Sequence, residues 1–268
     1  AAYNSFLEGG AGKVITTKGN NEMDMPFSYE NFVAPQEGCS LILTLDATVQ
    51  ACLEKQMEAA IARYDVQNGA FGMVMDVKTG EVLAMASYPT YNLDTFNEDY
   101  NDLLANEDNP LFNRALQGTY APGSIFKPLV GVAGLEEGLI TRYYTYTCDH
   151  VYTYYEDYQP TCLGWHPHFN VMDALRVSCN IFFYDLGRQL GIEPIIEYAE
   201  TFGLGQPTGI ELPEAKGHIS SPEFFDELDE LWNPGDVLQA SIGQGKSMFT
   251  PVQLATYTAT LANGGTRL

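Results

Sequence analysis

The chain has 268 residues, and its 13 basic and 35 acidic residues give it a formal net charge of −22. This charge argues against nucleic acid as a partner and against docking on anionic lipid, because both carry phosphate that the chain would repel. Hydrophobic residues make up 45% of the sequence, which is enough for one or two domains with a core. No apolar run in the sequence approaches the roughly 20 residues of a bilayer-spanning helix.

The first quarter of the chain begins without a clear pattern. Residues 1–35 are rich in glycine and polar side chains and show no sustained period. The apolar run at residues 41–45 predicts a strand. Residues 46–64 have the periodicity of a helix that is capped by Asp46 or Thr48.

Two further β-type runs follow this helix. Residues 70–76 and 81–87 predict an antiparallel hairpin, with Lys78-Thr79-Gly80 in its turn. Residues 91–109 are rich in Asn and Asp and predict a surface loop.

A serine and a lysine three residues apart stand at the head of the next apolar run. Ser124 and Lys127 follow the break at Pro122-Gly123, and the predicted helix ends near residues 137–138. On a helix this spacing places both side chains on one face. A lysine that is partly desolvated can accept the proton of a serine hydroxyl, which makes the serine a nucleophile. Alone, however, the pair also fits an ordinary helix start with an exposed lysine.

A second motif, Ser178-Cys179-Asn180, lies 54 residues after Ser124. It separates a predicted helix over residues 171–177, capped by Asn170, from another over residues 181–190. A hydroxyl and an amide at such a junction can face a cleft, where they relay a proton and hold a substrate carbonyl or the lysine. Either motif alone would fit a helix cap, but their order, spacing and flanks together indicate catalysis.

The remaining elements are mostly helical. Residues 143–158 are rich in tyrosine and fit either an aromatic wall along a peptide cleft or an amphipathic loop packed on the surface. Residues 193–202 predict a short helix closed by Gly203, and residues 251–262 predict a final helix. Strands early in the chain and helices after them favour an α+β layered domain.

Seven blocks in a fixed order carry a family resemblance: residues 43–46 with Gln50, 76–85 with 87–89, 113–115, 120–127, 178–180 with Phe183, 242–245 with 250–251, and 261–265. In these blocks the chain resembles the transpeptidase domain of class B penicillin-binding proteins. The resemblance implies an α+β fold in which helices cover an antiparallel sheet, the serine-bearing helix is central and the C-terminal strands are missing.

The resemblance also implies an activity. It is that of a D,D-transpeptidase that cross-links peptidoglycan stem peptides through an acyl-enzyme on Ser124, the serine that β-lactams acylate. Lys127 would be the base, Ser178 would relay a proton to the leaving group, and Asn180 would position the peptide and the lysine. The implied partners are stem peptides, β-lactams and other proteins of cell-wall and cell-shape synthesis, and no cofactor is required.

The same resemblance implies a domain organisation and a location. Residues 1–35 would be the end of an N-terminal pedestal, and residues 36–268 would be a transpeptidase domain that stops before the third motif, Lys-Thr/Ser-Gly. That motif normally supplies a cationic group and one N–H of the oxyanion hole. The family works on the extracytoplasmic face of the bacterial cytoplasmic membrane, so we expect an N-terminal anchor outside this chain.

The five cysteines fall into two groups. Cys39 and Cys52 are expected to be buried thiols. The other three, Cys148, Cys162 and Cys179, lie near histidines in the sequence and fit free thiols, a Cys148–Cys162 disulfide or a zinc site. Zinc is an alternative because some class B relatives hold zinc near this region. The spacing matches no standard zinc pattern, so all three alternatives stay open. The candidate ligands are Cys148, Cys162, His166 and Cys179.

Two other activities use the same serine. A serine β-lactamase needs a water activated for deacylation, and the sequence has no Glu-centred loop like that of the class A enzymes. A sensor or scaffold domain would bind β-lactam stably without turnover.

Overall fold

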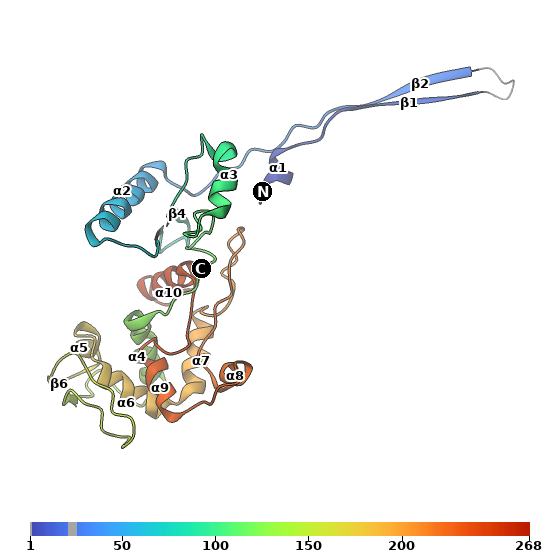
Figure 1. Cartoon of the computed structure of the whole chain (residues 1–268). Helices are drawn as coiled ribbons and strands as arrows, with labels where there is room; N and C mark the ends of the chain where they lie inside the picture. The colour runs from blue at the N-terminus through green and yellow to red at the C-terminus, as the bar shows by residue number, and fades with distance from the viewer. Residues whose placement is uncertain (1, 21–25) are drawn as a thin grey trace. The chain divides into compact units, whose positions relative to one another are not determined.

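The computed structural model describes residues 2–20 and 26–268, and it divides into two compact units, Ala1–Thr44 and Leu45–Leu268 (Figure 1). The first unit contains the short helix α1 (Asn4–Leu7) and an antiparallel pair of strands, β1 (Lys13–Asn20) and β2 (Pro26–Val33). This part of the sequence shows no sustained period, yet it forms a hairpin. The domain boundary predicted after residue 35 stays a prediction.

The run at residues 41–45 does not form a strand. No strand is assigned to these residues in the described part of the chain, and Ile42 is 98% exposed. The prediction is wrong because β-propensity produces a strand only where a neighbouring strand and a packed face support it.

The second unit begins with helix α2 (Ala47–Tyr64), which confirms the predicted helix. Of the two candidate caps, Asp46 is the one used, since its Oδ1 accepts hydrogen bonds from the N–H groups of Thr48 and Val49. Cys52 lies on this helix and is exposed, as is Cys39 in the first unit. The expectation that both are buried is therefore wrong. In α2 it is Leu53 that packs inward, against Gly72.

A β-hairpin follows α2, as predicted. Strands β3 (Ala70–Met75) and β4 (Val82–Tyr88) pair antiparallel, and α2 packs on both of them. Asp76 Oδ1 accepts hydrogen bonds from the N–H groups of Lys78 and Thr79, and Gly80 has a φ of +77° that favours glycine. Lys78-Thr79-Gly80 is thus a turn.

Helix α3 (Phe96–Ala105) lies where the sequence predicts a surface loop at residues 91–109. Its first turn contains acidic residues, and the hydroxyl of Thr95 donates to a carboxylate oxygen of Asp99. The rings of Phe96 and Tyr100, four residues apart, are in edge contact. These i, i+4 contacts outweigh the loop-like composition.

The rest of the unit is a helical assembly with the core of the protein. Its elements are η1 (Gly123–Phe126, a 3₁₀ turn), α4 (Lys127–Glu136), β5 (Tyr146–Cys148), β6 (His166–Phe169), α5 (Val171–Arg176), α6 (Asn180–Leu190), α7 (Ile192–Thr201), α8 (Pro222–Glu227), α9 (Pro234–Ser241) and α10 (Pro251–Ala262). Helix α4 packs against α6 and α7, α6 also packs against α9, and α10 packs on β3. The two-stranded sheet β5–β6 adjoins this assembly.

These bounds confirm the α+β class and the helices predicted over residues 171–177, 181–190, 193–202 and 251–262, within a residue or two. In the described residues no helix is both long enough and apolar enough to cross a bilayer.

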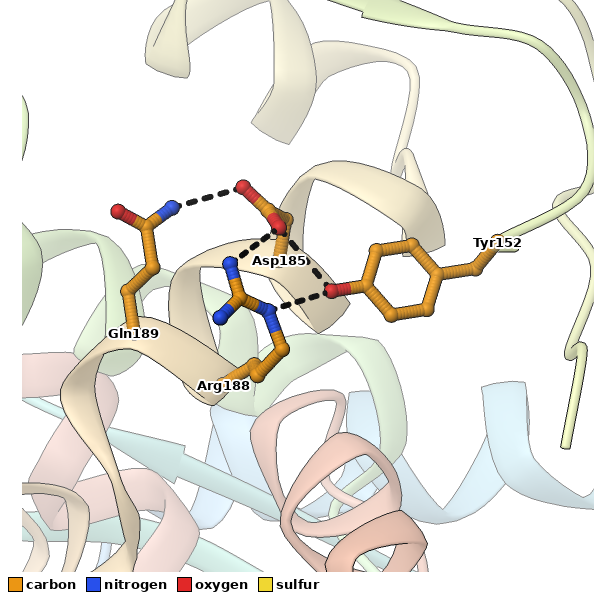
Figure 2. A network of polar contacts seen from close by, with 4 residues as sticks. All are labelled: Tyr152, Asp185, Arg188 and Gln189. Atoms are coloured by element: carbon orange, nitrogen blue, oxygen red, sulfur yellow. Dashed lines mark hydrogen bonds and ion pairs between the residues drawn. The ribbon is translucent and has the colours of Figure 1, made fainter. Parts of the chain in front are cut away.

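The tyrosine-rich segment packs on α6 through a polar network (Figure 2). The buried Tyr152 donates its hydroxyl proton to Asp185 Oδ1 at 3.0 Å and accepts a hydrogen bond from Arg188 Nε at 2.9 Å. Arg188 and Gln189 each donate to the same carboxylate, at 3.1 and 2.7 Å. This network supports the packed-loop interpretation, although Tyr154 is exposed.

The start of α4 depends on one side chain from α10. The hydroxyl of Tyr257, which is 1% exposed, accepts a hydrogen bond from Leu129 N–H and donates one to the carbonyl of Ile125, both at 3.1 Å. The first N–H groups of a helix have no partner within it, and no side chain of the N-cap residue Phe126 serves them here. Tyr257 therefore fixes the segment between residues 125 and 129.

Replacing Tyr257 by Phe should lower the free energy of unfolding by about 1 to 3 kcal/mol, because it leaves a buried N–H without a partner. Urea denaturation monitored by circular dichroism measures this change. The matched control is Tyr198→Phe, whose hydroxyl bonds Glu137 at the surface and whose loss should cost less than about 0.5 kcal/mol. Equal losses in the two variants would contradict this role of Tyr257.

Candidate active site

The predicted nucleophile lies on the surface at the start of the buried helix. Ser124 belongs to the turn η1 and is exposed, whereas Lys127, the first residue of α4, is 1% exposed. Pro122 and Gly123 precede the serine, and Gly123 has a φ of +59°. The chain bends at Gly123, and in the turn that follows the serine is exposed and the lysine is buried.

The ammonium group of Lys127 joins the two motifs. Its Nζ donates hydrogen bonds to the carbonyl oxygen of Ser178 at 2.8 Å, to Ser178 Oγ at 2.9 Å and to Asn180 Oδ1 at 2.7 Å. A lysine ammonium has three protons, so each has one acceptor. Ser124 is not among these partners. The structure therefore brings Lys127, Ser178 and Asn180 together and places Ser124 one turn away on the same segment.

The backbone of the second motif is shaped for this contact. Ser178 lies between α5 and α6 and has a φ of +52°, a left-handed conformation that is uncommon for residues with a side chain. Its hydroxyl and its carbonyl both bind Lys127. Asn180 begins α6, and the fully buried Cys179 between them anchors the junction to the core.

Burial changes the acid–base behaviour of this lysine. Desolvation lowers the pKa of Lys127 to about 8, and the nearby thiols of Cys162 and Cys179 oppose the shift. With a pKa near 8, about a tenth of the lysine is neutral at pH 7. A neutral amine is what a general base requires.

A loop from a distant part of the chain supports the serine turn. Gly123 N–H donates to the carbonyl oxygen of Gly243 at 2.7 Å, and Tyr120 and Phe249 exchange two backbone hydrogen bonds of 2.9 Å. Gly243 has a φ of +72°. In the sequence, residues 242–245 are recognisable only as a family block, and no local signal gives them a place in the site.

Three cysteines and a histidine form a second cluster. Their ligand atoms all lie within 4.8 Å of one another. Cys162 Sγ is 3.9 Å from Cys179 Sγ and 3.8 Å from His166 Nδ1. Two thiolates of a tetrahedral zinc site lie about 3.7 Å apart, so the spacing fits a metal ion. The cluster consists of Cys148, Cys162, His166 and Cys179.

The cysteines of this cluster are free thiols with different acidities. Cys148 and Cys162 are both unpaired, so the structure contains no disulfide between them. Burial raises the pKa of the Cys179 thiol. Burial opposes ionisation of Cys162 too, but hydrogen bonds from the backbone of Gly164, Asn180 and Ile181 lower its pKa overall.

The chain has relatives of known name and structure. Residues 70–268 match the family model described as the penicillin binding protein transpeptidase domain. The chain is 35% identical over 245 residues to the peptidoglycan D,D-transpeptidase MrdA of Acinetobacter baumannii and 34% identical over 244 residues to that of Escherichia coli K12, in both cases over 87% of this chain. A solved complex of PBP2 with MreC from Helicobacter pylori has a TM-score of 0.80 at 29% identity, over 98% of this chain.

The chain spans only part of each of these proteins. It covers 35% and 37% of the length of the two MrdA proteins and 49% of the solved chain.

Substituting Gly243 should disturb the serine turn. A Cβ at this position would lie 2.2 Å from the carbonyl oxygen of Gly123 and 2.7 Å from Phe126 Cβ. The left-handed backbone alone costs an alanine about 1 to 2 kcal/mol. We expect Gly243→Ala to lower the free energy of unfolding by about 1 to 3 kcal/mol beyond this, because the new Cβ would overlap with the serine turn.

Gly138→Ala is the control for that measurement. Gly138 has a similar φ of +68°, but nothing lies within 4 Å of its Cβ position. Urea denaturation of both variants isolates the overlap from the backbone strain. If the two lost the same stability, the close packing of Gly243 on the serine turn would be wrong.

Proposed function

Because the chain belongs to the penicillin-binding protein transpeptidase family, we propose that it carries the acyl-transfer site of a peptidoglycan D,D-transpeptidase. Its substrates are stem peptides that end in D-Ala-D-Ala, and β-lactams acylate the same serine. The observation that carries the proposal is the buried Lys127, bound to Ser178 and Asn180 next to an exposed Ser124.

The reaction takes place outside the cytoplasm, where the peptidoglycan lies. The protein acts there together with other cell-wall proteins. The names of the MrdA relatives support the first point, and the solved complex of PBP2 with MreC supports the second. The net charge of −22 does not conflict with this function. It argues against nucleic acid and anionic lipid as partners, and neither is a substrate of the reaction.

In the first step Ser124 Oγ attacks the carbonyl carbon of the penultimate D-Ala. Lys127 in its neutral form accepts the serine proton, and the backbone N–H of Ser124 stabilises the oxyanion. The C–N bond to the terminal D-Ala then breaks, and the leaving amine takes up a proton. The product is an ester on Ser124, which the amine of a second stem peptide resolves.

The hydrogen bonds of Lys127 support the proton path. A neutral amine has two protons and one lone pair, so it can donate to the Ser178 carbonyl and to Asn180 while the lone pair, released from its contact with Ser178 Oγ, accepts the Ser124 proton. Ser178 then links the base to the leaving group, and Asn180 holds both the lysine and the substrate peptide. The contact between Lys127 and Ser178 is compatible with either protonation state.

Intact-protein mass spectrometry after incubation with benzylpenicillin tests these roles. We expect a stable adduct on the wild-type protein, none on Ser124→Ala, and acylation slowed about 10²- to 10⁴-fold by Lys127→Ala, since a general base contributes that much. The control is Lys246→Ala, which removes a lysine that pairs with Glu230 at the surface.

Three results would contradict the assignment. Acylation of Lys127→Ala at the wild-type rate would mean that another group is the base. An adduct that hydrolyses within seconds would favour a β-lactamase, and a stable adduct without release of D-Ala from a stem-peptide mimic would favour a sensor.

We also propose that the cysteine–histidine cluster holds one structural Zn²⁺. The spacing of its ligand atoms and the burial of its thiols support this. Four protein ligands close the coordination shell of zinc, so such an ion stabilises a fold and leaves no open position for a substrate. Here it would tie strands β5 and β6 to the start of α6. The ligands would be Cys148, Cys162, His166 and Cys179.

Elemental analysis of protein purified without chelator should find one zinc per chain. His166→Ala should lose this zinc, whereas His168→Ala, an exposed histidine on the same strand, should retain it. With zinc bound, only Cys39 and Cys52 should react quickly with a thiol reagent, because both are exposed. Metal-free protein of the same stability would end the zinc proposal.

A further inference from the structure

A groove in the second unit lies between helix α2, strand β4 and two segments that follow β4 in the chain. Its volume is about 990 Å³, at the upper end of the range for small-molecule sites. The lining residues lie within 51–61, 85–88, 90–94 and 110–113, and they include no residue of the proposed acyl-transfer site or of the cysteine–histidine cluster. The groove is therefore a separate candidate site.

Hydrogen bonds between its walls hold this groove open. Gln50 on α2 binds β4 twice, since its Nε2 donates to the carbonyl of Met85 and its Oε1 accepts from the Met85 N–H, both at 2.9 Å. The hydroxyl of Ser87 donates to the carbonyl of Phe112 at 3.3 Å and accepts a hydrogen bond from Arg114 N–H at 3.2 Å. The walls are thus fixed before any ligand binds.

The same contacts close the edge of β4 to an added peptide strand. Strand addition needs free N–H and C=O groups along the edge. At Met85 both of these groups bind Gln50, and the carbonyl of Leu83 accepts the N–H of Asp46 at 2.9 Å. Recognition in the groove is therefore left to the side chains that line it.

These side chains combine exposed rings with free polar groups. Tyr88 and Tyr91 are 36% and 37% exposed, and the ring of Phe96 supports that of Tyr91, with centroids 5.2 Å apart. Among the described residues, no hydrogen-bond partner is present for the two tyrosine hydroxyls or for the carboxylates of Glu58 and Asp94. The electron-rich face of a ring packs on the C–H groups of a sugar, and hydroxyls and carboxylates bind its OH groups. This set of groups suits a saccharide.

The charge of the groove selects among saccharides. Its lining contains three carboxylates, those of Glu54, Glu58 and Asp94, and one cation, Lys55. Like charges repel, so a sugar that carries phosphate or carboxylate is disfavoured. A neutral sugar meets no such repulsion, and its hydroxyls can donate to the free carboxylates.

We propose that this groove binds a neutral glycan strand of N-acetylated amino sugars. Tyr88 and Tyr91 pack on the sugar rings, and Glu58 and Asp94 accept hydrogen bonds from sugar hydroxyls. The choice of sugar rests on the proposed transpeptidase function, because the glycan strands that carry stem peptides consist of such sugars. The groove holds the strand, and the stem peptide carries the reacting bond to Ser124.

NMR titration of the ¹⁵N-labelled protein with chitotetraose, a neutral oligomer of N-acetylglucosamine, tests the proposal. We expect saturable shifts at residues of the groove in the wild-type protein. Tyr91→Ala and Asp94→Ala should each weaken binding about 5-fold, because each removes one contact with the sugar. The matched control is Tyr143→Ala, a tyrosine outside the groove that is 74% exposed, and it should bind as the wild type does. A hyaluronan tetrasaccharide, which carries carboxylates, should bind at least about 10-fold more weakly.

Four results would overturn the inference: no saturable shift in the wild type, wild-type binding in both groove variants, equal weakening by Tyr143→Ala, or equal binding of the two oligosaccharides. Acylation by benzylpenicillin is read separately. Tyr91→Ala and Asp94→Ala should be acylated at the wild-type rate, which also shows that they are folded, because a penicillin contains no sugar. Absence of acylation in the wild type would contradict the proposed transpeptidase function, whereas the titration alone decides whether the groove binds glycan.

Discussion

The burial of one ammonium group constrains the centre of this protein. A buried lysine is tolerated only when its protons have acceptors, and Lys127 finds them in two oxygens of Ser178 and one of Asn180. Ser178, in a left-handed conformation between two helices, and Asn180, the first residue of α6, supply these acceptors. The same burial lowers the pKa of the lysine, so the contact that stabilises the fold also prepares a base.

Distant segments hold this contact in place. Tyr257 from α10 fixes the first turn of α4, and Gly243 supports the bend that carries Ser124. Tyr152 binds the segment between β5 and β6 to α6 (Figure 2). The cysteine cluster links the same segment to Cys179, inside the second motif. The nucleophile itself stays outside this packed region, where a substrate can reach it.

The sequence predicts the features that depend on local signals. A cap at Asp46 or Thr48 and the helix over residues 251–262 follow from the residues themselves, and so does the proximity of Ser124 and Lys127 along the chain. The meeting of Lys127 with Ser178 and Asn180 is anticipated by the chemistry of the two motifs and by the family resemblance, and by no local signal, since the contact spans 51 residues. The strand expected at residues 41–45 is not among the strands of the described residues, and the support that Gly243 gives to the serine turn is missed because only the fold brings Gly243 to Gly123.

The claim at the centre of this account is that Lys127 is a base because it is buried. An NMR titration of protein labelled at the lysine Cε, with the Lys127 signal assigned by its absence from Lys127→Ala, measures this directly. The account predicts a titration midpoint for Lys127 at about 8. A midpoint near the ordinary value of 10.5 would contradict it, because the lysine would then be cationic at neutral pH and unable to accept the proton of Ser124.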